Sequence, residues 1–227
     1  MITAAAPGSL GDGDVVVVAH KAVSKAEGRL RRLSEIDPGE RARALATEFG
    51  KDPRQVQAVL DESAAVLRAE RGVLICETHH GFVCANAGVD ASNAADPDEL
   101  VLLPTDPDDS ARRLRARIGE LRGVRPGVIV SDSFGRAWRL GQTDVAIGAA
   151  GVRVLDDWRG RRDAYGRELT ATFIAAADSL AATADLARAK DSGEPAVLIS
   201  GAENLVTLHD GPGAAALRRP RAEDLFR

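Results

Sequence analysis

Short uninterrupted apolar runs indicate the strands of this chain. The clearest is DVVVVAHK at residues 14–21, and the run RPGVIV ends at Val130 after Pro126 and Gly127. Apolar runs of this length between turn-forming or charged residues are typical of buried strands. Five further segments carry the same signal: 72–78, 81–87, 99–104, 145–157 and 194–201. Segments 72–78 and 81–87 flank a Thr-His-His-Gly turn, so we expect them to pair as neighbouring strands.

Helical periodicity occupies four other segments. The predicted helices cover residues 33–52, 53–67, 106–122 and 169–190. Asp52 followed by Pro53 is a helix-start signal, and Gln55 completes a capping-box pattern. A buried stripe is expected at Val56, Leu60, Ala64 and Leu67. Acidic residues at the start of 106–122 and arginines along the rest suit the helix dipole.

The remaining segments are predicted to be polar loops, at residues 22–29, 88–96 and 131–144. Strands and helices are mixed without a regular βαβ period or an internal repeat. The pattern therefore predicts an irregular α/β or α+β fold. No linker separates independent domains, so we expect residues 1–227 to form a single module.

The composition of the chain argues against several classes of function. The 227 residues are 44% hydrophobic and 28% charged, with a net charge of −4. That charge gives no general attraction to nucleic acid or to an anionic membrane. We see no signal peptide and no apolar run near the roughly 20 residues that span a bilayer. Two cysteines are too few for a disulfide framework. We therefore expect the protein in the cytoplasm.

Two predicted loops combine carboxylates with hydroxyl or amide groups. Asp90 and Asn93 lie in GVDASN, and Asp132 and Ser133 lie in SDS, each after a predicted strand. Such hard oxygen atoms are the ligands that Mg²⁺ or Mn²⁺ prefers. Turn residues that bond their own backbone are the competing interpretation, because Asp and Asn are common in turns.

Cationic side chains near these loops are candidates for phosphate or carboxylate contacts. Lys21 and Lys25 follow the first strand, and they are two of only four lysines. Arg136 and Arg139 flank Trp138, whose indole could stack on a flat ligand or anchor the loop. Solvated surface charges are the alternative for both lysines.

The pair of cysteines raises the question of a zinc site. Cys76, His79, His80 and Cys84 form a Cys/His cluster in the sequence. Because the cysteines lie in apolar strands and the histidines in a turn, buried thiols are favoured over zinc. Neither the Walker GxxxxGK[ST] pattern nor a Rossmann GxGxxG is present.

Longer motifs carry a family resemblance. KAVSKAEGR, GFVCANAGVDASNA, SDSFGRAWRLGQTDVAIGAAG and DAYGREL occur in this order. The chain thereby resembles the coenzyme F420-0:γ-glutamyl ligase family from about Gly11 to Phe226. That family joins L-glutamate to the phospholactyl carboxylate of the 5-deazaflavin precursor F420-0, using GTP. The resemblance implies a two-lobed fold that forms an intertwined homodimer, with no nucleic-acid or membrane partner.

The resemblance also assigns roles to individual residues. It implies that Asp90, Asp132 and Ser133 bind Mg²⁺ or Mn²⁺, with K⁺ as a further candidate. Asp132, Arg136 and Arg139 are expected to take part in catalysis. The expected nucleotide contacts are His20, Lys25, Asn93, Leu186, Lys190 and Gly193.

The chain also departs from the family pattern in ways that keep other functions open. A segment of the G-[IL]-P-E type, which precedes the first strand in the family, is missing from the printed sequence, and His20 stands where the family commonly has Ser or Thr. One alternative is a paralogue that binds nucleotide or deazaflavin coenzyme without ligating. Another is a two-metal phosphohydrolase that uses the same aspartates.

Overall fold

The computed structural model describes residues 10–92, 96–189 and 191–225. The chain divides into two compact units. Unit 1 is built from Met1–Ala19, Pro107–Ser133 and Thr143–Arg227, and unit 2 from His20–Asp106 and Phe134–Gln142. Each unit is described separately below.

Unit 1 contains a sheet with the strand order β11-β1-β7-β8. Its centre is β1 (Val15–Ala19), which runs parallel to β7 (Gly127–Arg136) and antiparallel to β11 (Ala196–Ile199). Strand β7 leads through a tight turn into its neighbour β8 (Arg139–Ala150). The apolar run of β1 is explained by burial on both faces of the sheet, as in other parallel pairs.

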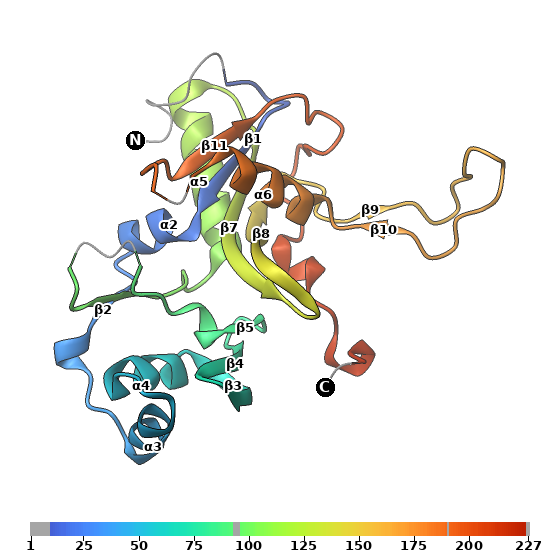
Figure 1. The fold of residues 1–227 in the computed structure, drawn as a ribbon. Helices are drawn as coiled ribbons and strands as arrows, with labels where there is room; N and C mark the ends of the chain where they lie inside the picture. Colours follow the sequence, from blue (N-terminus) through green and yellow to red (C-terminus); the bar gives the residue numbers. More distant parts are fainter. Residues whose placement is uncertain (1–9, 93–95, 190, 226–227) are drawn as a thin grey trace. The chain divides into compact units, whose positions relative to one another are not determined.

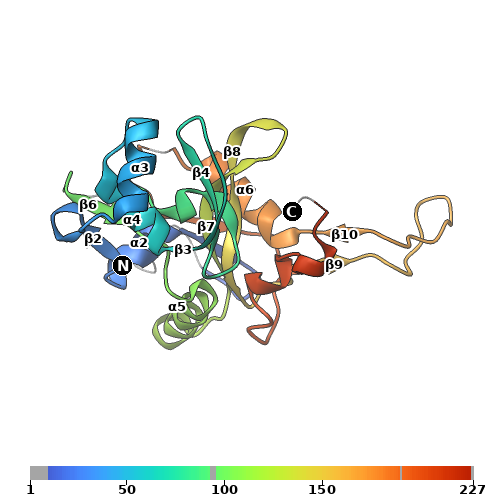
Figure 2. The same ribbon diagram turned by 90° about the horizontal axis from the view of Figure 1, so that it is seen from below.

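Two helices cover this sheet. Figures 1 and 2 show α5 (Pro107–Arg122) and α6 (Ala176–Ala187) on opposite sides of β1 and β7. On the α6 side, alternate strand residues such as Val17 and Ile129 join a core with the helix alanines and Leu180. The alanine content of α6 lets the helix pack closely on the sheet.

A thin two-stranded ribbon also belongs to unit 1. It is formed by β9 (Asp156–Asp157) and β10 (Phe173–Ile174), which pair antiparallel, and an isolated bridge joins Arg162 to Glu168. Figure 1 shows the ribbon extending away from the sheet of unit 1. The remaining elements of this unit are the short 3-10 helices η3 (Ala214–Leu217) and η4 (Arg221–Glu223).

Unit 2 contains an antiparallel sheet with the order β3-β4-β5. Its strands are β3 (Ser63–Glu70), β4 (Val73–Thr78) and β5 (Val83–Ala85). The helices α3 (Glu40–Phe49) and α4 (Pro53–Asp61) share a core with this sheet that includes Val56, Val59 and Leu74. As predicted, the Asp52 side chain caps α4, accepting a hydrogen bond from the Arg54 backbone at 2.8 Å.

Unit 2 also contains several shorter elements. They are α2 (His20–Ala26), the pair β2 (Leu30–Arg32) and β6 (Glu99–Val101), and the 3-10 helices η1 (Leu33–Glu35) and η2 (Asn86–Gly88). The mixed α/β fold class is therefore confirmed. The seven predicted strand regions all contain strand residues, although the segment 145–157 holds parts of two strands.

Three local predictions are wrong. Residues 20–26 form a helix rather than entering a loop, because buried Val23 and Ser24 give the segment an inner face. Helix α4 ends at Asp61, so Ala64 and Leu67 lie in β3, where pairing with β4 overrides their helical propensity. The last long helix starts at Ala176 instead of Leu169, because the preceding residues belong to the ribbon.

The polar segment 131–144 was also predicted incorrectly as a loop. Strand β7 continues to Arg136 and β8 begins at Arg139, so most of the segment is a hairpin. Its polar side chains hid the strand signal, which depends on apolar residues. None of the helices in the described part of the chain is long and apolar enough to cross a bilayer.

Candidate functional site

The first candidate site, in unit 2, is centred on Asp90. The Lys21 ammonium at the start of α2 lies 2.6 Å from Asp90 Oδ2 and 2.6 Å from the Ser92 hydroxyl. Ser92 also donates from its backbone N–H to Asp90 Oδ1 at 2.7 Å. The Asp90 backbone forms a bridge with Val101 at the end of β6, which fixes the position of the carboxylate.

The environment of Asp90 keeps its carboxyl ionised. Burial raises the pKa of this group, but hydrogen bonds from Lys21 and Ser92 outweigh that effect and leave the pKa below its usual value. The side chain is still 44% exposed, and that of Lys21 is 21% exposed. An ionised and accessible carboxylate next to a cation is a chemically suitable position for a metal ion or an ammonium group.

The two other candidates on α2 differ in exposure. His20 is buried, and its Nδ1 lies 3.5 Å from the Ser24 hydroxyl. Lys25 is exposed in the last turn of the same helix. Only Lys25 is therefore directly accessible to solvent.

The second candidate site, in unit 1, is centred on Asp144 of β8. Ser131 and Ser133 of β7 donate their hydroxyl hydrogens to Asp144 Oδ2 and Oδ1, at 2.7 and 2.6 Å. Arg188, just after α6, donates to Asp144 Oδ2 at 2.6 Å. Asp144 is only 1% exposed, so this network replaces its hydration inside the unit.

Asp132 has a different orientation from the two serines beside it. Successive side chains of a strand point to opposite faces, so Asp132 faces away from the side on which Ser131 and Ser133 reach Asp144. Its Oδ1 accepts a hydrogen bond from the Ser133 backbone N–H at 2.8 Å. Asp132 is only partly buried and remains a candidate ligand on its own face of the sheet.

Sequence reasoning placed Asp144 only within the polar segment 131–144 and did not include Arg188. Asp144 lies 11 residues from Ser133, and Arg188 lies 44 residues from Asp144. The available signal was the alternation of Ser131, Ser133 and Asp144 on a hairpin. This alternation would have predicted the contact only if the segment 131–144 had been recognised as two paired strands.

The tip of the β7–β8 hairpin carries the remaining predicted catalytic residues, and it belongs to unit 2. Arg136 donates to the Leu140 carbonyl at 3.0 Å, which closes the turn. Trp138 has a φ of 60° and is 82% exposed, so its indole does not anchor the loop in a core. Arg139 is exposed as well.

The predicted nucleotide segment is only partly described. Asn93 and Lys190 lie outside the described residues. Leu186 is 91% exposed near the end of α6, and Gly193 has a φ of 70° in the turn before β11. Nothing in this geometry alone identifies a bound ligand.

The favoured interpretation of the cysteines agrees with the structure. Cys76 and Cys84 are buried, opposite each other on β4 and β5. His79 Nε2 bonds the Asp61 carbonyl at 3.0 Å, and His80 Nε2 bonds the Pro104 carbonyl at 2.9 Å. Across the described part of the chain, no three His, Cys, Asp or Glu side chains converge as a metal-binding group. The oxygen ligands predicted at Asp90, Asp132 and Ser133 stay predictions.

Comparison with known proteins identifies the family of this chain. The family described as F420-0:Gamma-glutamyl ligase matches residues 1–201. The chain belongs to this family. A protein named Coenzyme F420:L-glutamate ligase from Methanopyrus kandleri is 49% identical over 220 residues, covering 96% of this chain and 87% of the relative. A relative of the same name from Methanocaldococcus jannaschii is 43% identical, covering 95% and 85%. Another from Archaeoglobus fulgidus is 49% identical, covering 84% and 76%.

Proposed function

We propose that this protein is a ligase that joins L-glutamate to coenzyme F420-0 in the biosynthesis of coenzyme F420. The observation that carries the proposal is the 49% identity, over 96% of the chain, to a relative named Coenzyme F420:L-glutamate ligase. The match of the family to residues 1–201 includes Asp90, Asp132 and Ser133.

The proposed reaction uses GTP because a carboxylate is a poor electrophile. The γ-phosphoryl group passes to a carboxylate oxygen of F420-0, which gives an acyl phosphate and GDP. The glutamate amine then attacks the acyl carbon, loses a proton and expels inorganic phosphate, leaving an amide. Cationic side chains and accurate positioning are the usual protein contributions to such transfers. Lys25, Arg136 and Arg139 are the exposed cations that we assign to this role.

Asp90 supports the proposed need for a divalent cation. Its carboxylate is ionised, partly exposed and already holds the Lys21 ammonium at 2.6 Å, so it can accept a cation at this position. In unit 1, Asp132 offers a carboxylate and Ser133, on the opposite face of β7, a hydroxyl oxygen, and each is proposed separately as a ligand. Mg²⁺ or Mn²⁺ would supply charge neutralisation for the phosphate oxygens, and K⁺ is a further candidate.

We assign the nucleotide to His20, Lys25, Asn93 and the segment that includes Leu186, Lys190 and Gly193. His20 stands where the family commonly has a hydroxyl group but is buried on α2, so the accessible Lys25 ammonium carries this part of the assignment. The turn at Gly193, with its positive φ, leaves the backbone accessible without a side chain.

The ribbon of unit 1 supports a homodimer of two-lobed subunits. Tyr165, Phe173 and Ile174 are 92%, 48% and 41% exposed on it. A thin ribbon with exposed apolar side chains gains stability when a second copy covers it. We therefore propose that the ribbon contacts a partner subunit, which can be tested by measuring the molar mass of the protein in solution.

The test of the proposed function is an omission assay. Purified protein is mixed with F420-0, L-glutamate, GTP and Mg²⁺ or Mn²⁺, and the products are measured by mass spectrometry. A mass gain of one or more glutamyl units that requires every component supports the ligase. Phosphate release that does not need the amine would instead indicate a phosphohydrolase. Coenzyme binding without any mass gain would indicate a non-catalytic paralogue.

A further inference from the structure

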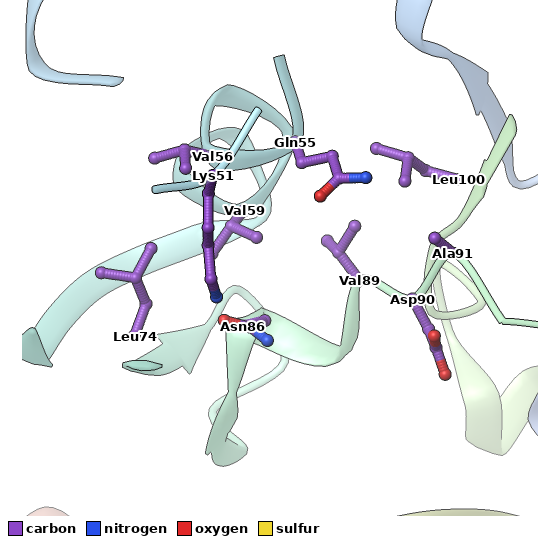
Figure 3. Close-up of a pocket in the computed structure, with 10 residues that line it drawn as sticks. All are labelled: Lys51, Gln55, Val56, Val59, Leu74, Asn86, Val89, Asp90, Ala91 and Leu100. Carbon is purple, nitrogen blue, oxygen red and sulfur yellow. The ribbon is translucent and has the colours of Figure 1, made fainter. Parts of the chain in front are cut away.

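A pocket in unit 2 combines an unpaired cation with two amide side chains. Its volume is about 160 Å³, and Figure 3 shows Lys51, Gln55 and Asn86 around it, with Asp90 on the side opposite Lys51. The walls between them are apolar and include Val59 and Leu74. The pocket thus offers polar groups at its edges and a surface for methylene groups between them.

The cation of this pocket is available for a ligand. Among the described residues, neither the Lys51 ammonium nor the Gln55 and Asn86 amides have a hydrogen-bond or ion-pair partner. The neighbouring Arg54, by contrast, is held by Asp52 at 2.6 Å. Free ammonium and amide N–H donors are complementary to a carboxylate.

The backbone that presents Asn86 is strained. Asn86, Ala87 and Gly88 have φ values of 52°, 51° and 72°, three left-handed residues in succession. Ala87 is 2% exposed within the core, and a Cβ at Gly88 would lie 2.7 Å from the Leu103 side chain. Strain of this kind persists where the surrounding structure enforces it, and it is concentrated at ligand sites.

We infer that this pocket binds L-glutamate, the amine acceptor, with Lys51, Gln55 and Asn86 holding a carboxylate of the amino acid. This inference rests on the proposed function for the identity of the amino acid. A volume of about 160 Å³ suits a molecule of amino-acid size and excludes a nucleotide or a deazaflavin ring system. Asp90 lines the same pocket, so the bound amino acid lies beside the carboxylate assigned to the metal.

Kinetics with varied L-glutamate tests the inference. Lys51→Gln should raise the KM for L-glutamate roughly 10- to 100-fold, the effect expected when a charge-assisted hydrogen bond is lost. The KM for GTP should stay unchanged, and Lys51→Arg should recover most of the loss. Asn86→Gly keeps the left-handed backbone but removes the amide, and it should raise the same KM to a smaller extent.

A matched control is Arg43→Gln on α3. It removes an exposed cation that pairs with exposed Asp37 at 3.2 Å, and it should leave every KM unchanged. An unchanged KM for L-glutamate in Lys51→Gln, in an active enzyme, would overturn the pocket assignment and leave the ligase intact.

Calorimetric titration separates the two proposals. L-glutamate is titrated into the full chain without GTP or coenzyme, for the wild type and for Lys51→Gln. Weaker binding by the variant supports the pocket even if the wild type fails to ligate, in which case only the proposed function fails. Equal binding by both proteins, or no binding by the wild type, counts against the pocket.

Discussion

Two carboxylates of this protein each lie 2.6 Å from a cation, yet their surroundings differ. In unit 1, Asp144 is 1% exposed and its partner Arg188 is 10% exposed. In unit 2, Asp90 is 44% exposed and Lys21 is 21% exposed. The two ion pairs therefore have the same length but different exposure, and we expect them to have different roles. A buried pair must remain intact to compensate desolvation, whereas an accessible pair contributes little stability and can exchange its cation.

The contrast also separates a structural carboxylate from one that we propose binds a cation. Ser131, Ser133 and Arg188 all donate hydrogen bonds to Asp144 within unit 1, which makes it a fixed support for the β7–β8 hairpin. Asp90 keeps an open side, and its pKa is lowered although burial alone would raise it. Asp90 is therefore the carboxylate of the two that solvent and a ligand can reach.

Breaking the Asp144 pair should produce the largest effect. Asp144→Ala leaves the guanidinium of Arg188 buried and unpaired, so the free energy of unfolding should fall by about 3–5 kcal/mol. Urea unfolding followed by circular dichroism measures this change. The double variant Asp144→Ala/Arg188→Met should recover part of the loss because both charges are gone. A single variant as stable as the wild type would contradict the structural role.

The corresponding change at Asp90 should affect activity instead. Asp90→Asn should lower kcat by about 10²–10³-fold, because charge stabilisation of the transferred phosphoryl group is lost. The free energy of unfolding should change by no more than about 1 kcal/mol. Asp37→Asn, which alters another exposed pair, should change neither quantity. If Asp90→Asn kept full activity and lost much of its stability, the proposed difference between Asp90 and Asp144 would be contradicted.

The two serines that reach Asp144 offer a finer test. Ser131→Ala and Ser133→Ala each remove a hydrogen bond to the carboxylate, so each should lower the free energy of unfolding by about 1.5–3 kcal/mol. Only Ser133→Ala should also change the dependence of activity on Mg²⁺ concentration. Identical activity profiles for the two variants would remove Ser133 from the proposed metal site.

The smallest effect concerns pH and a third carboxylate, Asp178. Burial raises the pKa of Asp178, although the hydrogen bond from the Ala146 backbone opposes this. Because the folded state favours the protonated acid, its contribution to stability is present below the unfolded pKa, about 3.9, and is lost as the pH rises through the folded pKa. The wild type should therefore lose stability relative to Asp178→Asn as the pH rises above the unfolded pKa of about 3.9. A difference in Tm that is independent of pH would refute this.

The sequence predicted those parts of the molecule whose signals are local. The apolar run of β1 and the Asp52–Pro53 start of α4 are both found in the structure. The candidates Asp90, Asp132 and Ser133 came from the polar composition of two loops, and the family resemblance then implied their role in metal binding. Their local partners, such as Ser92 beside Asp90, could have been inferred from their closeness in the chain.

Long-range partners could not be predicted in the same way. Lys21 meets Asp90 across 69 residues, and Arg188 meets Asp144 across 44. These contacts depend on how strands and helices pack, which no local pattern encodes. The hairpin of residues 131–144 was missed because its polar faces lack the apolar alternation that indicates a strand. The network at Asp144 explains two of its polar side chains, Ser131 and Ser133.

Asp132, a partly exposed carboxylate on β7, is proposed to support ligation without supporting the fold. The most direct measurement compares Asp132→Ala with the wild type in the complete ligation assay, with Tm recorded for both. The account predicts that the wild type adds glutamate to F420-0, while the variant keeps its Tm and loses ligation by about 10³-fold. Near-normal turnover by Asp132→Ala would contradict the account.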